Sequence, residues 1–164
     1  MIRKIISGGQ TGADRAALDF AIRHKIPHGG WVPKGRRAED GKLPHKYRLV
    51  ETATGETSER TEKNVLDSDG TLIISHGPLT GGSALTEDLA RLYRKPWIHI
   101  DLKTTSYSKA AGMIREWTRH KGIKVMNVAG ARASKDPEIY RAVTELLEAV
   151  KKERTLQDTP FTGA

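Results

Sequence analysis

The sequence contains no cysteine, few aromatic residues and no long apolar run. The lack of cysteine excludes disulfides and thiolate metal sites, and it is typical of a cytoplasmic protein. No segment approaches the roughly 18 consecutive apolar residues that a membrane-spanning helix needs. The chain begins with Met1-Ile2-Arg3-Lys4 and enters an apolar stretch directly, without the pattern of a signal peptide. We therefore expect a cytoplasmic protein with no membrane partner.

Positive charge is in excess, with a net charge of +8, and it suggests an anionic partner. The basic residues are spread along the chain, without a Lys/Arg-rich block, stacking aromatics in a basic strand or a zinc knuckle, so nucleic acid is not favoured. Solvated helix faces explain much of the excess. The cluster Lys34, Arg36 and Arg37 suits a phosphate-bearing small ligand, although a plain solvated loop is the alternative. The histidines show no zinc-ligand spacing, so no metal site is predicted.

The apolar patterning predicts alternating strands and helices. We expect strands at 2–7, 71–75, 97–100 and 124–128, and a weaker one at 28–32. We expect helices at 12–24, at 58–67, over an apolar face formed by Leu85, Leu89, Leu92 and Tyr93, after Tyr107, and after an Asp136 N-cap. This order predicts an α/β fold: a three-layer Rossmann-like sandwich with a mainly parallel sheet of about five strands. Residues 1–153 would form one ligand-binding domain, and residues 154–164 a flexible C-terminal tail.

The segment 33–56 is charged and has little periodicity. A loop this long inside a compact domain is usually functional or disordered. We favour a functional loop, because it follows a strand end where ligands bind in such sheets.

A first glycine-rich loop, "SGGQTGADR", joins the first strand to the first helix. Glycines there let backbone N–H groups approach a phosphate, and the helix N-terminus favours negative charge. Gln10 and Thr11 would add side-chain donors, Arg15 a cation, and Asp14 a helix cap or a contact to a ligand hydroxyl. The candidate ligand residues are Gly8, Gly9, Gln10, Thr11, Gly12, Asp14 and Arg15. The loop matches neither dinucleotide nor Walker-type motifs, and a tight strand-to-helix turn is the structural alternative.

A second loop repeats this arrangement after the strand at 71–75, and its candidates are Thr80, Gly81, Gly82, Ser83 and Thr86. A third loop after the last strand carries Asn127, Gly130, Arg132 and Ser134, and it would serve equally well as an N-capping turn. Arg60 and Asn64 lie one helical turn apart and would share a face that points into the cleft or to water. Because the carboxyl ends of parallel strands meet at one edge, we expect these loops to converge.

Catalytic signatures are scarce in the sequence. There is no G-x-S-x-G motif. Glu87 and Asp88, the acids nearest to a glycine loop, are better explained as partners of a helix dipole. The sequence therefore favours a binding protein over an enzyme.

Five segments in order resemble the molybdenum carrier family, which is molybdenum-cofactor carrier-like: "SGGQTGADRAALDFA", "GGWVPKGRRAEDG", "RTEKNVLDSDGTLI", "GPLTGGSALT" and "NVAGARASKDPEIY". The resemblance spans about residues 5–150, and the family belongs to a Rossmann-like superfamily with the DNA-processing protein DprA and the lonely-guy phosphoribohydrolases. It implies a homo-oligomer (dimer or tetramer), an anion site on 8–12 and 80–83, and a carrier for the molybdenum cofactor (molybdopterin), a pterin with a terminal phosphate.

The chain departs from lonely-guy enzymes in one motif. Those enzymes carry P-G-G-x-G-T-x-x-E, whereas Ala84 and Leu85 stand here in place of the second Gly-Thr pair and Asp88 in place of the glutamate. We therefore expect a protein that binds and carries a phosphorylated small molecule, the molybdenum cofactor or a nucleotide-like ligand, at the C-terminal edge of its sheet. The alternatives are a nucleoside-monophosphate phosphoribohydrolase and a single-strand nucleic-acid binder related to DprA.

Overall fold

The structure is a computed structural model that describes residues 1–157, with side chains described for 1–152. Five helices and a central parallel sheet confirm the predicted α/β class. In chain order the elements are β1 (Lys4–Ile6), α1 (Ala13–Arg23), β2 (His28–Gly29), β3 (Trp31–Val32), β4 (Arg37–Ala38), β5 (Gly41–Lys42), β6 (Val50–Glu51), α2 (Thr57–Asp67), β7 (Gly70–Ser75), α3 (Gly81–Leu92), β8 (Trp97–Asp101), α4 (Tyr107–Lys121), β9 (Val125–Gly130) and α5 (Ile139–Gln157).

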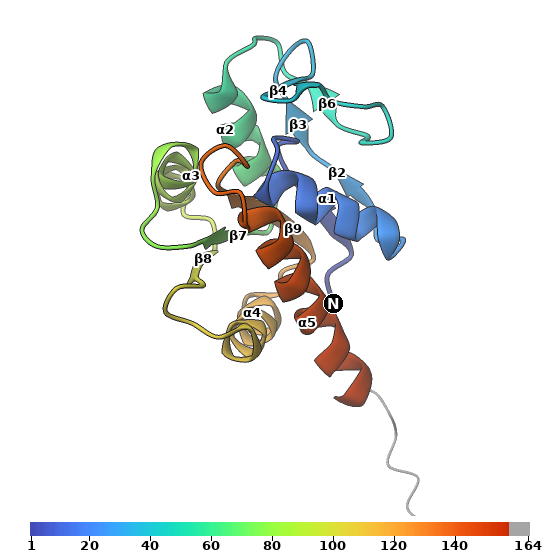
Figure 1. Cartoon of the computed structure of the whole chain (residues 1–164), viewed down its shortest axis with the longest axis vertical. Coiled ribbons are helices and arrows are strands. Elements are labelled where there is room, and N and C mark those ends of the chain that lie inside the picture. The colour runs from blue at the N-terminus through green and yellow to red at the C-terminus, as the bar shows by residue number, and fades with distance from the viewer. Residues whose placement is uncertain (158–164) are drawn as a thin grey trace, which may run out of the picture.

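The central sheet has the strand order β2-β1-β9-β7-β8, and all neighbouring strands are parallel. Helices α1, α4 and α5 pack together on one face, and α2 packs with α3 on the other (Figure 1). If the strands are counted from β9, the order along the sheet reads 3-2-1-4-5, as in a doubly wound Rossmann sheet. The direction of winding reverses between β9 and β7. Ligands bind at the carboxyl ends of the strands at such a point.

The two faces of the sheet differ in polarity. Side chains alternate across a strand, and the residues that join the core under α1, α4 and α5 are apolar, among them Ile5, Leu72, Ile74, Ile100, Met126 and Val128. On the opposite face Asn127 Nδ2 donates to Thr71 Oγ1 at 3.2 Å, and α3 turns Ser83 and Thr86 inward. The space between the sheet and α2 and α3 therefore contains polar groups beside apolar ones such as Ile73.

Helix α3 carries the expected apolar residues, but Leu85 and Leu89 are only half-buried. Its buried residues are Ser83, Thr86 and Ala90, whereas Leu92 is 70% exposed and Tyr93 39% exposed. Periodicity shows that the leucines share a face. It does not show which neighbour covers that face.

The weak strand at 28–32 is split by Gly30. Its first half is β2 of the main sheet, and its second half, β3, pairs with β6 instead. Gly30 has φ +125°, and a Cβ there would lie 2.3 Å from the carbonyl oxygen of Ser7. Only glycine allows both this conformation and this approach.

The segment 33–56 is an ordered insertion. It contains the β4–β5 hairpin and β6, and Leu43, Tyr47 and Leu49 form a small core with Leu18 and Val32. The insertion therefore covers α1 as a folded unit.

Helix α5 begins close to its predicted cap, since the backbone N–H of Glu138 donates to Asp136 Oδ1 at 3.1 Å. The helix continues to Gln157, past the expected domain end at residue 153. The rest of the expected tail, 158–164, lies outside the described residues. No helix among the described residues is long and apolar enough to cross a bilayer.

Candidate functional site

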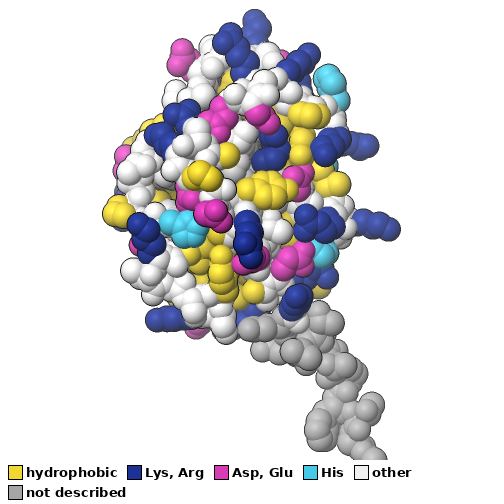
Figure 2. Space-filling view, in the orientation of Figure 1, with side chains coloured by type: hydrophobic (Ala, Val, Ile, Leu, Met, Phe, Trp, Pro, Cys, Tyr) yellow, Lys and Arg dark blue, Asp and Glu magenta, His cyan; other side chains and the backbone are white. Residues whose placement is uncertain are grey.

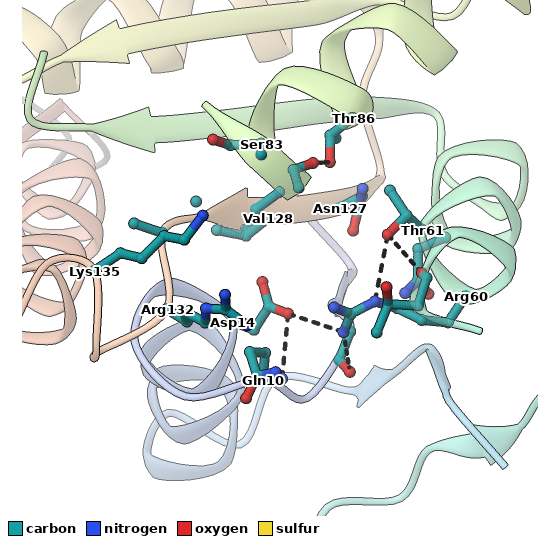
Figure 3. Close-up of a pocket in the computed structure, with 18 of the residues that line it drawn as sticks. Gln10, Asp14, Arg60, Thr61, Ser83, Thr86, Asn127, Val128, Arg132 and Lys135 are labelled. Carbon is teal, nitrogen blue, oxygen red and sulfur yellow. Dashed lines mark hydrogen bonds and ion pairs between the residues drawn. The ribbon is translucent and has the colours of Figure 1, made fainter. Parts of the chain in front are cut away.

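A pocket of about 320 Å³ lies beyond the carboxyl ends of β1, β7 and β9, where the winding of the sheet reverses (Figure 3). The two glycine-rich loops and the third strand-end loop meet there, and α2 closes one side. The predicted site residues that line it are Gly8, Gln10, Asp14, Arg60, Asn64, Thr80, Gly81, Gly82, Ser83, Thr86 and Arg132.

Two glycines of the first loop do not line the pocket, and the structure gives them another role. Gly12 has φ +78°, and a Cβ there would lie 2.4 Å from the carbonyl oxygen of Ala131. Gly9 has φ +77°, and its Cβ would lie 2.9 Å from a methyl group of Leu43. Both positions need glycine for the turn and for close packing, so the structural alternative holds for them.

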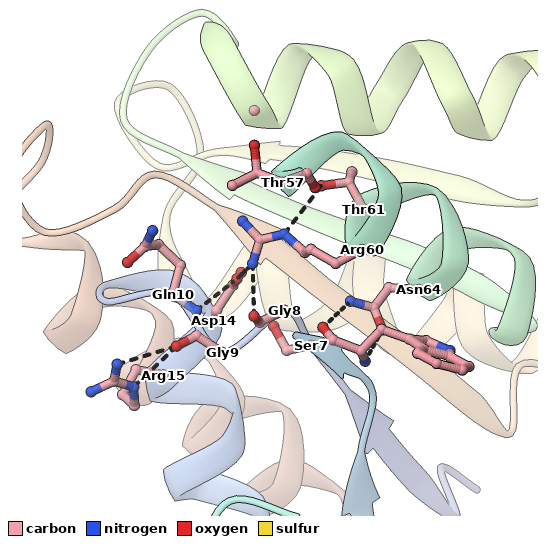
Figure 4. Close-up of polar contacts among 12 residues, drawn as sticks. Ser7, Gly8, Gly9, Gln10, Asp14, Arg15, Thr57, Arg60, Thr61 and Asn64 are labelled. Carbon is pink, nitrogen blue, oxygen red and sulfur yellow. Dashed lines mark hydrogen bonds and ion pairs between the residues drawn. The ribbon is translucent and has the colours of Figure 1, made fainter. Parts of the chain in front are cut away.

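Thr11 and Arg15 also turn away from the pocket. The Thr11 hydroxyl donates to Glu39 and accepts from the N–H of Ala133 at 3.1 Å. Arg15 pairs with both carboxylate oxygens of Asp40, at 2.9 and 3.0 Å (Figure 4 shows it directed away from Arg60). The expected cation of the first helical turn is thus already neutralised by the insertion.

The cations expected from the insertion do not reach the pocket either. Arg36 is 6% exposed, and its guanidinium donates to four backbone carbonyls of the insertion at 2.7–3.1 Å. Lys34 is exposed on the insertion and is absent from the lining. The expectation that Arg36 neutralises a ligand is therefore wrong, because this side chain organises the fold of the insertion.

Arg60 is the cation that α2 contributes to the pocket wall. Its Nη1 donates to the carbonyl oxygen of Gly8 at 2.7 Å and lies 3.4 Å from Asp14 Oδ2, while Nε donates to Thr61 Oγ1 at 3.3 Å (Figure 4). Its Nη2 donates to no group in the described part of the chain. One donor group of a largely buried guanidinium is therefore available to a ligand.

Asp14 places a carboxyl group inside the pocket, 8% exposed. Burial raises its pKa, against the lowering effects of the Arg60 charge and of the Gln10 backbone N–H. Asn64, by contrast, uses its amide to hold β3: it accepts from the N–H of Trp31 at 2.8 Å and donates to the carbonyl of Trp31 at 3.1 Å. Asn64 is thus a structural part of the wall.

The N-terminus of α3 faces the pocket from the other side. Gly81, Gly82 and Ser83 line the pocket, and no side chain caps the helix. The Ser83 hydroxyl donates to the carbonyl of Thr80 at 2.8 Å, and the Thr86 hydroxyl to that of Gly82 at 2.8 Å. The first-turn N–H groups have no intrahelical acceptor and point to this space.

Asn127 and Gly130, candidates of the third loop, also line the pocket. Sequence reasoning missed the other lining residues, namely Thr57, Thr61, Val128, Ala129, Ala131 and Lys135. Thr57 lies at i−3 from Arg60 on α2, so the helical period could have found it. Lys135 lies close to Gly81, since a Cβ on Gly81 would come 3.0 Å from its Nζ. Ser134, a candidate of the third loop, instead donates its hydroxyl to Glu39 at 2.6 Å.

Charged side chains of both signs are dispersed over one face of the described part of the chain. Figure 2 shows Lys and Arg side chains scattered among acidic ones on the face that carries α1 and α5. Asp88 stands where the lonely-guy motif has its glutamate, and it is exposed and outside the pocket lining. The neighbouring Glu87 pairs with Arg91 at 3.1 Å. Among the described residues no three His, Asp or Glu side chains gather into a cluster that could hold a metal ion.

Comparison with known proteins agrees with this topology. Residues 5–151 match the model of the circularly permutated YpsA SLOG family. A crystal structure named "Putative molybdenum carrier protein", from Syntrophus aciditrophicus SB, is 65% identical, with a TM-score of 0.90 over 91% of this chain and 94% of that one. No curated protein matches the chain. A sheet whose strand order becomes 3-2-1-4-5 when counted from β9 is what a circular permutation produces, and the chain belongs to the circularly permutated YpsA SLOG family.

Proposed function

We propose that the chain binds a phosphate-bearing small molecule in the pocket between α1, α2 and α3. The observation that carries this proposal is the uncapped N-terminus of α3, whose Gly81, Gly82 and Ser83 line the pocket. Free N–H groups at a helix N-terminus bind anions through hydrogen bonds and through the helix dipole.

The charges around that N-terminus support an anionic ligand. Lys135 lies beside Gly81, Arg132 lines the same end, and Arg60 directs a free donor inward from α2. Charge-assisted hydrogen bonds from such groups contribute about 1.5–3 kcal/mol each. A volume of about 320 Å³ suits a small molecule rather than a macromolecular segment.

We propose a carrier role, with a ligand related to molybdenum. The name of the 65% identical protein suggests that ligand class, and the molybdenum cofactor fits the pocket chemistry because it carries a terminal phosphate. The carboxylate that the lonely-guy motif would supply falls at Asp88, which is exposed and not in the pocket; the carboxyl group among the described lining residues is that of Asp14. Steady release of free base from AMP would contradict the carrier role.

We also propose that the chain forms a homo-oligomer through α3. Leu92, Tyr93 and Leu66 of the neighbouring helix are 70%, 39% and 37% exposed, so they form an apolar surface on α3 and α2. Asp88 and Arg94 flank Leu92 and are exposed. In a two-fold pairing of α3 with its copy, each Asp88 would meet the Arg94 of the other subunit, so the surface is complementary to itself.

The anion site is tested by placing a carboxylate at Gly82, where an added Cβ meets no atom within 4 Å. We expect Gly82→Glu to weaken inorganic phosphate binding, measured by titration calorimetry, by about tenfold or more. Stability should be unchanged or about 0.3–1 kcal/mol higher, because acids stabilise the first turn of a helix. Ser108→Glu is the matched control, since it adds the same charge to the exposed first turn of α4. Equal phosphate affinity in wild type and Gly82→Glu would contradict the proposal.

Ligand identity and subunit number can be read together. Native mass spectrometry of freshly purified protein should show a retained phosphate-bearing small molecule and a multiple of the chain mass. An apo monomer that also fails to bind inorganic phosphate would contradict both proposals.

A further inference from the structure

The pocket has a second end whose chemistry is opposite to that of the α3 N-terminus. Asp14 Oδ2 accepts from the backbone N–H of Gln10 at 3.2 Å and from Arg60 at 3.4 Å. The Ser7 hydroxyl lies beside the carboxyl and donates to the carbonyl of Val128 at 2.6 Å. Figure 3 shows the other carboxylate oxygen directed away from Gln10 and Arg60, into the pocket.

Asn127 adds a second acceptor at this end. The residue is 3% exposed and belongs to β9, below the pocket. Its Nδ2 is held by the 3.2 Å bond to Thr71 Oγ1, and its Oδ1 accepts from no group in the described part of the chain. Asn127 lines the pocket, and Figure 3 shows its side chain facing the space between Val128 and Arg60.

A ligand that fills this end of the pocket takes both acceptors out of contact with water. A polar group removed from water is costly unless a partner satisfies it. An oxyanion bound at the N-terminus of α3 places no donor at this end, and its negative charge repels an ionised Asp14. The pocket, at about 320 Å³, is also larger than one oxyanion requires.

We propose that the pocket selects a two-ended ligand, with a phosphate at the N-terminus of α3 and N–H or O–H donors at the other end for Asp14 and Asn127. The inference rests on the proposed phosphate site and adds the class of group at the far end of the ligand. Asp14 is then a specificity residue, because it disfavours simple anions and favours phosphates attached to a donor-bearing sugar or heterocycle.

The test compares three probes by titration calorimetry: inorganic phosphate, ribose 5-phosphate and guanosine 5′-monophosphate. Wild type should bind at least one of the two organic phosphates about tenfold or more tightly than inorganic phosphate. A preference for ribose 5-phosphate would assign the donors to sugar hydroxyls. A preference for the nucleotide alone would assign them to the N–H groups of the base.

Asp14→Asn should reduce the ratio of organic-phosphate affinity to inorganic-phosphate affinity by about tenfold. The variant should bind inorganic phosphate as tightly as wild type or more tightly. Asn127→Leu is a second variant of similar volume and should reduce the same preference. Asp40→Asn is the matched control, because that carboxylate pairs with Arg15 outside the pocket lining. No preference in wild type, or an unchanged preference in Asp14→Asn, would overturn the inference. If wild type binds none of the three probes, the result would instead contradict the proposed phosphate site itself.

Discussion

Arg60 Nη1 donates to the carbonyl oxygen of Gly8 at 2.7 Å, although the two residues lie 52 positions apart in the chain. The bond joins α2 to the loop after β1. Each of these elements contributes to the pocket wall, so a single guanidinium fixes the separation of its two sides. The same nitrogen approaches Asp14, which gives that buried carboxyl its nearest positive charge.

Replacement of Arg60 should therefore affect both stability and binding. We expect Arg60→Met to lower the free energy of unfolding by about 1–3 kcal/mol, because the carbonyl of Gly8 and the Asp14 carboxyl lose their charged partner. Phosphate affinity should fall about tenfold. Urea unfolding and phosphate titration measure the two effects. Arg60→Lys keeps the charge and should recover part of the affinity; wild-type stability in Arg60→Met would refute the role in the wall.

Arg36 should behave differently, because its four carbonyl partners all belong to the insertion. We expect Arg36→Met to destabilise the protein by about 2–4 kcal/mol, since buried carbonyls lose charged hydrogen bonds. Phosphate affinity of the folded protein should change by no more than about twofold. Arg37→Met, one residue on and exposed, is the control and should stay within about 0.5 kcal/mol of wild type. A large loss of phosphate affinity at normal stability would restore Arg36 to the binding site.

The contrast between these arginines shows what the sequence could and could not predict. The strands at β1, β7, β8 and β9 and the convergence of three loops followed from apolar runs and from the geometry of parallel sheets. The buried position of Arg36 could not be predicted in this way. Its partners are backbone carbonyls, which every residue has, so they leave no pattern in the sequence. Gly9 and Gly12 posed a related problem: a positive φ and a phosphate contact both call for glycine.

Acidic pairs and helix faces were predictable only in part. Glu39 and Asp40 are adjacent in the sequence but point in different directions: Glu39 accepts from Ser134, and Asp40 pairs with Arg15. No local rule could show that these acids link the insertion to the site loops. The apolar face of α3 was predicted from its leucines. Which surface packs against that face could not be inferred, because the periodicity is the same whether the partner is the sheet or a second chain.

That exposed face leads to a prediction about assembly. We expect wild type to be a dimer or tetramer and Leu92→Asp to have the mass of one chain, because a charge at the centre of an apolar interface is costly to bury. Since Leu92 is 70% exposed, the isolated subunit should lose no more than about 0.5 kcal/mol. Sedimentation velocity measures the mass. Val50→Asp, at a residue 58% exposed on the insertion, should leave the assembly intact. A monomeric wild type, or an unchanged mass for Leu92→Asp, would exclude α3 as the interface.

The last prediction uses the raised pKa of Asp14. Sulfate is the suitable probe, because its charge stays constant in mild acid, whereas phosphate gains a proton. Asp14 is the acidic side chain among the described residues that line the pocket. Sulfate affinity of wild type should rise as the pH falls from about 7 through the raised pKa, because protonation removes a negative charge from the pocket.

Asp14→Asn should bind sulfate more tightly than wild type at about pH 7, and its affinity should depend less on pH. The stability effect has a defined sign. The pKa of Asp14 is higher in the folded state than in the unfolded state. Asp14 therefore contributes its full stabilisation to the folded state at a pH below the unfolded-state pKa, and this stabilisation is lost as the pH rises through the folded-state pKa. Asp14→Asn should therefore be at least as stable as wild type at about pH 7 and lose that advantage in acid. A wild-type sulfate affinity that does not change with pH would show that Asp14 does not face the bound anion.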